Sequence, residues 1–188
     1  MKNSKLIRLA QMSLLAAIAV VLVMLVHFPL IPSMPFLQYD MADVPILLAS
    51  LLFGPWAGLV ILFVVSAIQA FLFGGDGWVG LVMHFVASGA LVVCTGLFYR
   101  YKHQHKLLWA ALGMALGTIA MALIMIPMNL IFTVHVYGTP QDVVMAMIFP
   151  GILPFNLIKG GLNSLLAMLL FKALSPFIRK NKEMIQPQ

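Results

Sequence analysis

Long apolar runs, separated by short polar stretches, are the feature that most constrains this chain. Of its 188 residues, 63% are hydrophobic and only 9% are charged, and the mean hydropathy is +1.06. A soluble globular domain carries roughly 25% charged and 45–50% apolar residues, so this chain has too little polar surface to fold in water. The composition therefore predicts an integral membrane protein and excludes a soluble enzyme, a nucleic-acid-binding protein and a disordered chain.

Six hydrophobic segments are predicted as transmembrane helices of a single membrane domain that covers residues 1–188. Their approximate bounds are 6–28, 43–53, 55–73, 78–99, 107–132 and 149–174. The second and third segments form one apolar run that would be about 46 Å long as a single helix, against a hydrocarbon core of about 30 Å. Gly54-Pro55 lies inside this run, so either one kinked helix tilts strongly or two helices meet at a turn there.

The placement of Lys and Arg decides between five and six helices, because these residues concentrate in cytoplasmic loops. The three basic clusters are Lys2/Lys5/Arg8, Arg100/Lys102/Lys106 and Lys172/Arg179/Lys180/Lys182. A break at Gly54-Pro55 places all three clusters on one side, whereas a single long helix forces the middle cluster to the opposite side. We therefore predict six helices with both termini in the cytoplasm. Four aspartates then lie outside or at the outer boundary: Asp40, Asp43, Asp76 and Asp142.

Lys159 is the one basic residue that falls within an apolar segment, well over a turn from either end. An unpaired charge at that depth costs several kcal/mol. Asn156, Lys159 and Asn163 share one helix face, and Gly160 leaves space beside it. We interpret this face as the wall of a protein interior or a wet cavity. The alternatives are a Lys159 side chain that snorkels to the membrane surface, or asparagines that only join helices.

Asn129 and the loop at 36–43 are the other unusual polar features. Asn129 follows Pro127 within the fifth helix, and its residue type leaves open whether it joins two helices or contacts a ligand. The loop alternates apolar and polar residues, as a strand-like plug over a cavity would, and Pro29, Pro32 and Pro35 stiffen the chain before it. Asp43 is expected to cap the second helix, with Pro45 near its first turn.

The sequence predicts ligand binding and gives no sign of catalysis. His84 is expected to hydrogen-bond a neighbouring helix rather than to line the cavity, and Cys94 to be a small packing residue. The sequence has no Ser/His/Asp set, no paired carboxylates at depth, no metal-spaced cluster and no phosphate-binding Gly-x-x-x-x-Gly-Lys loop. We therefore expect a protein without enzymatic activity, metal or cofactor.

Two groups of residues together resemble the riboflavin-specific substrate-binding (S) subunits of energy-coupling factor (ECF) transporters. The groups are Phe36-Leu37-Gln38-Tyr39-Asp40 with Asp43-Val44-Pro45 and Leu52-Phe53-Gly54-Pro55, and Pro154-Phe155-Asn156-Leu157-Ile158-Lys159-Gly160. The resemblance covers nearly the whole chain. It implies a multi-pass protein of the bacterial cell membrane that binds riboflavin near the extracellular side, under the loop after the first helix. It also implies a transmembrane coupling protein and two cytoplasmic ATPases as partners, which agrees with the missing phosphate loop.

The resemblance also implies the site residues. The family's positions that contact the flavin ring correspond to Asn129, Asn156 and Lys159. Its positions that contact the ribityl side correspond to Leu37, Gln38, Tyr39 and Asp40. Gln38 stands where a lysine is expected in relatives. The family docks its first helix on the coupling protein through Ala-x-x-x-Ala, and the nearest match here is Ser13-x-x-x-Ala17 with Ala10 one turn earlier.

The chemistry of these residues suits riboflavin, which is neutral near pH 7. An asparagine both donates to and accepts from the polar edge of the flavin ring, and a lysine donates to a carbonyl or a ring nitrogen. Aromatic and methionine side chains cover the ring face. The open alternatives are the same class of subunit with another vitamin or small polar-aromatic substrate, a structural or assembly protein of the membrane, and a membrane enzyme.

Overall fold

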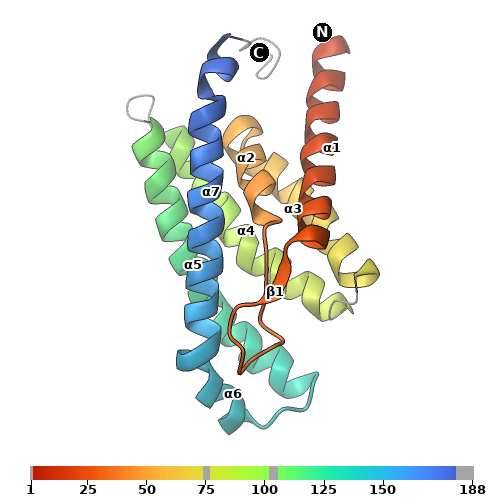
Figure 1. Ribbon diagram of the computed structural model, residues 1–188, viewed down its shortest axis with the longest axis vertical. Coiled ribbons are helices and arrows are strands. Elements are labelled where there is room, and N and C mark those ends of the chain that lie inside the picture. The colour runs from red at the N-terminus through yellow and green to blue at the C-terminus, as the bar shows by residue number, and fades with distance from the viewer. Residues whose placement is uncertain (1, 74–76, 102–105, 181–188) are drawn as a thin grey trace.

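The computed structural model describes residues 2–73, 77–101 and 106–180. Its helices are α1 (Lys2–Leu25), α2 (Asp43–Phe53), α3 (Pro55–Leu72), α4 (Gly77–Tyr101), α5 (Lys106–His135), α6 (Gln141–Met147) and α7 (Leu153–Lys180), with a π-helical turn, η1, at Ile148–Ile152. Because α6, η1 and α7 follow one another without a break, the described ranges contain six helical rods (Figure 1). The prediction of a helical chain with six helices is therefore confirmed.

Five of these rods are long and apolar enough to cross a membrane, judged over the described residues. They are Lys5–Leu25, Pro55–Leu72, Gly77–Tyr101, Lys106–His135 and Gln141–Phe177. The exception is α2, whose 11 residues rise only about 16 Å, roughly half of a hydrocarbon core. The prediction of six transmembrane helices is corrected on this point, since α2 is too short to cross a membrane alone.

Both ends of the first and of the last helix also differ from the predicted bounds, since the first begins at Lys2 and the last ends at Lys180. The first helix ends at Leu25 rather than near residue 28, because His27–Pro29 form strand β1. This strand pairs antiparallel with β2 (Gln38–Asp40), with His27 opposite Asp40 and Phe28 opposite Tyr39. The last helical rod begins at Gln141 rather than near residue 149.

The chain turns sharply between α2 and α3 at Gly54, so the long apolar run is two helices. Gly54 has a φ of 100°, a conformation that L side chains rarely adopt, and its N–H donates to the Ser50 carbonyl at 2.9 Å. A Cβ at this position would also collide with the Arg100 guanidinium. Pro55 then starts α3, where its missing N–H costs nothing.

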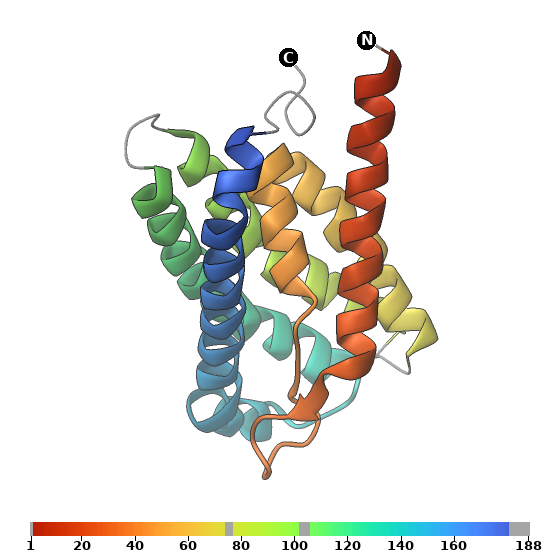
Figure 2. The ribbon, with the colours of Figure 1, turned by 45° about the horizontal axis from the view of Figure 1, so that its top comes forward.

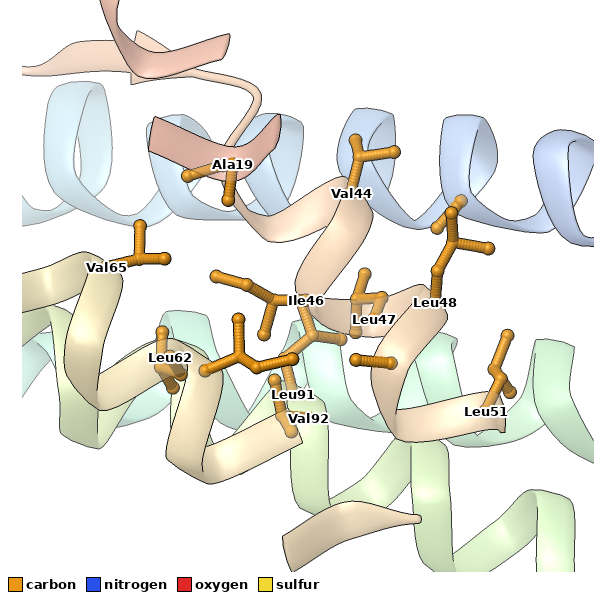
Figure 3. Close-up of a cluster of buried hydrophobic side chains, with 14 of the residues drawn as sticks. Ala19, Val44, Ile46, Leu47, Leu48, Leu51, Leu62, Val65, Leu91 and Val92 are labelled. Atoms are coloured by element: carbon orange, nitrogen blue, oxygen red, sulfur yellow. The ribbon is translucent and has the colours of Figure 1, made fainter. Parts of the chain in front are cut away.

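Helix α2 forms the centre of the apolar core. Ten of its eleven residues are buried, and Ile46 packs in one cluster with Leu62 of α3 and Leu91 of α4 (Figure 3). Ser50 adds a polar contact by donating to the Val92 carbonyl at 2.9 Å. The short α2 is thus held by the helices that surround it.

The first turns of α1 and the last turns of α7 lie at one end of the bundle, and the β1–β2 pair with its loop lies at the other (Figures 1 and 2). Three residues of the charge argument, Asp76, Lys102 and Lys182, lie outside the described residues. The end that carries the loop also carries the cavity.

Candidate functional site

A cavity of about 640 Å³ lies between the loop and the helices α3, α4, α5 and α7. Much of its wall is apolar and includes Phe73, Met83, Met121, Met125 and Phe155. The polar side chains on its wall are His27, Gln38, Asp40, Ser66, Gln69, His84, Asn129, Thr133, Tyr137, Thr139, Asn156 and Lys159. A mostly apolar cavity with a few convergent polar groups is typical of a site for a small organic molecule.

Asp40 and Lys159 form an ion pair at this wall. The Lys159 Nζ atom lies 2.6 Å from Asp40 Oδ2, and both residues are buried. Gln69 of α3 donates to the same carboxylate oxygen at 3.3 Å, and the Ala42 N–H donates to Oδ1 at 3.0 Å. Lys159 therefore does not snorkel: its charge is neutralised within the protein, by the loop.

The electrostatics of Asp40 follow from these contacts. Burial alone would raise the pKa of its carboxyl, but the positive charge of Lys159 and the hydrogen bonds from Lys159 and Ala42 lower it, to about 2. Asp40 is therefore ionised at neutral pH and ties the loop to α3 and α7.

Tyr39 points away from the cavity, because successive side chains of a strand lie on opposite faces. Its hydroxyl donates to Asn163 Oδ1 at 2.9 Å, and the Asn163 amide donates to the Asp40 carbonyl at 3.1 Å. Burial raises the pKa of the Tyr39 hydroxyl, and the nearby Asp40 charge adds to this shift. Tyr39 and Asn163 thus hold β2 on α7, and it is Gln38 and Asp40 that face the cavity.

Asp43 does not cap α2, contrary to the prediction. The helix has no side-chain cap, and Asp43 instead lies fully buried in its first turn. Its Oδ2 accepts from the Ser88 hydroxyl at 3.1 Å, and its Oδ1 lies 3.5 Å from Nε2 of His84. These partners lie on α4, forty or more residues further along the chain, so the local capping pattern gave no sign of them.

Asn129 and Asn156, the two asparagines predicted to contact the flavin ring, form side-chain hydrogen bonds with residues of their own helical rods. Asn129 donates to the Met125 carbonyl at 2.8 Å and accepts from Thr133 at 3.1 Å. Asn156 donates to the Ile152 carbonyl at 2.7 Å. Both line the cavity and neither joins two helices through these bonds. Of the seven predicted contact residues, six line the cavity together: Leu37, Gln38, Asp40, Asn129, Asn156 and Lys159.

Seven polar residues of the cavity wall were not predicted as contacts: His27, Ser66, Gln69, His84, Thr133, Tyr137 and Thr139. Gln69 is an amide in a mostly apolar helix, a signal that could have drawn attention to it. His84 was expected only to bond a neighbouring helix; its Nδ1 does lie 3.0 Å from the Ser66 hydroxyl of α3, but its side chain also lines the cavity. Cys94 is half-buried on α4 and is not among the lining residues.

The predicted docking residues Ala10, Ser13 and Ala17 are all exposed on one face of α1. Only 11% of the most apolar window of α1 is buried, against 39–44% for the other four spanning helices. Helix α1 therefore presents a face of small residues that the other described residues leave uncovered.

Comparisons with known proteins agree with this geometry. The model of the family "ECF transporter, substrate-specific component" matches residues 7–171. The riboflavin transporter RibU of Staphylococcus aureus is 32% identical over 152 residues, which are 78% of this chain and 79% of that protein. The riboflavin transporter FmnP of Bacillus subtilis is 31% identical over 156 residues, which are 78% of this chain and 81% of that protein.

One solved structure is similar over almost the entire chain. It is described as the S component of a bacterial ECF transporter, and it superimposes with a TM-score of 0.79 at 32% identity. The match covers 95% of this chain and 99% of the solved one. Given the family match, the relatives and the shared fold, this chain belongs to the family of substrate-specific components of ECF transporters.

Proposed function

We propose that this chain is the riboflavin-capturing subunit of an ATP-driven ECF importer in a bacterial cell membrane. It binds the vitamin and has no enzymatic activity of its own. Two relatives that are 31% and 32% identical over 78% of this chain are riboflavin transporters. The observation that carries the proposal is a cavity in which the amides of Asn129 and Asn156 and the ammonium of Lys159 converge beside methionine and aromatic side chains.

In this proposal the ring of the flavin lies between Asn129, Asn156 and Lys159. The amides supply both donors and acceptors, and Lys159 has three N–H donors, of which the contact with Asp40 uses one. Methionine and phenylalanine side chains cover the faces of the ring. The ribityl hydroxyls face Leu37, Gln38 and Asp40 in the loop, while Tyr39 acts through the position of the strand.

The proposed orientation puts both termini in the cytoplasm and the loop outside, over the bound vitamin. Basic residues then concentrate on the inner side, as they do in most membrane proteins. ATP hydrolysis belongs to two separate cytoplasmic subunits, which act through a transmembrane coupling protein.

A fluorescence titration of the detergent-purified chain with riboflavin tests the substrate. We expect saturable quenching with one binding site, and no competition from a vitamin that lacks a flat tricyclic ring. A chain that leaves riboflavin fluorescence unchanged, or that binds the competing vitamin equally well, would contradict the proposed substrate.

The exposed face of α1 is the proposed docking surface for the coupling protein, since small residues let helices approach closely. Ala17→Trp should abolish riboflavin uptake by cells and leave riboflavin binding by the purified chain unchanged. Ile18→Trp is the matched control, because it changes a residue that is already large and 42% exposed about 100° around the helix. Equal uptake by the two variants would remove Ala17 from the docking surface.

A further inference from the structure

The loop, taken here as residues 30–40, lies along the rod formed by η1 and α7. It contacts every fourth residue of that rod, from Gly151 to Asn163. Gly151 of η1 receives Met34, and Phe155 packs with Leu37 and Tyr39. Further along the helix, Lys159 pairs with Asp40, and Asn163 bonds Tyr39 and the Asp40 carbonyl. Residues four apart share one face of a helix, so the loop follows a single stripe.

The two ends of this stripe differ in the kind of contact they make. At Lys159 and Asn163 the loop is held by an ion pair and hydrogen bonds. At Gly151 it is held by the methionine side chain of Met34, seated where a Cβ would otherwise be. That contact depends on shape alone, because dispersion attraction falls off within a fraction of an ångström.

Gly151 leaves the space that the end of the Met34 side chain occupies. A Cβ built there would collide with the Met34 sulfur and would lie 3.6 Å from Cδ1 of Leu37. Gly161 on the same rod offers the contrast, because a Cβ there meets no atom of the described residues within 4 Å. A methyl group would therefore displace a neighbouring side chain at Gly151 but not at Gly161.

Backbone hydrogen bonds connect Met34 to the residues of the loop that line the cavity. The Met34 N–H donates to the Ile31 carbonyl at 2.9 Å, and the Leu37 N–H donates to the Met34 carbonyl at 3.0 Å. Phe36 and Leu37, which follow this turn, line the cavity. A shift of Met34 would therefore move the part of the wall that the loop contributes.

We propose that the seating of Met34 against Gly151 holds the outer end of the loop over the cavity and sets the rate at which bound ligand leaves. Met34 and Gly151 are positioning residues: they act through Phe36 and Leu37 and do not contact the ligand themselves. This inference rests on the proposed riboflavin-binding function.

The test is the rate of riboflavin release from Gly151→Ala, with Gly161→Ala as the matched control. The new methyl group displaces the end of the Met34 side chain from Gly151, so we expect about tenfold faster release from Gly151→Ala. Gly161→Ala should release riboflavin at the wild-type rate. Equal release from the two glycine variants would overturn the proposal.

Met34→Ala supplies an independent route that does not depend on how Gly151→Ala folds. Losing the methionine should also speed release about tenfold, whereas Met24→Ala, at a methionine 63% exposed on α1, should not. In the double variant the new methyl at 151 fills space left at 34, so release should be no faster than in either single variant. Fully additive effects, or equal release from Met34→Ala and Met24→Ala, would contradict the contact. If the wild type does not bind riboflavin, the proposed function fails first, and this inference fails with it.

Discussion

The two ends of the bundle are held together by different forces. Around α2 the helices meet through aliphatic side chains such as Leu47, which is completely buried, and the turn at Gly54 is closed by backbone hydrogen bonds. Around the loop the chain is held by an ion pair and by side-chain hydrogen bonds that border a cavity. The comparison shows a packed apolar core at one end and, at the other, a cavity bordered by polar contacts between distant segments.

Lys159→Met should have the largest effect, because it removes two interactions at the end of the bundle that carries the loop. It removes a proposed donor to the flavin and leaves Asp40 buried without its partner. Removing one member of a buried pair typically costs about 3–5 kcal/mol of folding stability, so the thermal midpoint should fall. A hydrogen bond from a charged donor is worth about 1.5–3 kcal/mol, so riboflavin affinity should fall about 10–100-fold in a titration.

A double variant separates the two roles of Lys159. Lys159→Met with Asp40→Asn removes both charges, so thermal stability should recover while riboflavin affinity stays low. Recovery of affinity together with stability would show that Lys159 supports the loop and does not contact the vitamin. Wild-type affinity in the single variant would contradict the site itself.

Leu47→Ala should weaken the other end without touching the site. Large-to-small changes of a buried leucine cost about 2–5 kcal/mol, so the thermal midpoint should fall clearly. Riboflavin affinity of the folded protein should stay within about threefold of wild type, a free-energy change of under 1 kcal/mol. A large loss of affinity at unchanged stability would mean that the two ends are not separate.

Acid should loosen the loop end selectively. Since the pKa of Asp40 is lowered from 3.8 to about 2, folding favours its ionised form. The stability that this provides is fully present above the ordinary pKa of 3.8 and is lost as the pH falls through about 2. We expect wild type to release bound riboflavin as the pH falls from about 4 toward about 2, with no contribution from this group between about pH 5 and pH 7. Asp40→Asn should lack this acid-dependent step, and an identical acid profile in that variant would assign the step to another group.

Arg8→Ala should have the smallest effect. The Arg8 guanidinium donates to the Phe53 carbonyl at 3.1 Å and lies 5.8 Å from the Phe53 ring centroid, at the end of α2. Because Arg8 is exposed, the stability cost should be at most about 1 kcal/mol, with riboflavin affinity unchanged. A loss of affinity would connect this end of α2 to the cavity.

Patterns in the sequence predicted where the long apolar run breaks and which charge is buried. The break at Gly54-Pro55 follows from the basic clusters, which all lie on one side only if the run is two helices. The interior position of Lys159 follows from the cost of a charge in an apolar segment. Both predictions agree with the structure.

The contacts of the loop end could not be predicted because they join distant segments. Asp40 and Lys159 are 119 residues apart, and Tyr39 and Asn163 are 124 apart. Which of two adjacent residues, Tyr39 or Asp40, faces the cavity depends on strand pairing with β1. The partners of Asp43 on α4 are also more than forty residues away, so the local pattern indicated only a capping role.

The visible absorption spectrum of the detergent-purified protein, followed by mass spectrometry of the small molecules released on denaturation, tests the central claim most directly. We predict a yellow protein that releases riboflavin in near-stoichiometric amount, and a colourless Lys159→Met variant. A colourless wild type that also fails to take up added riboflavin would contradict the proposed substrate, while the family membership would remain.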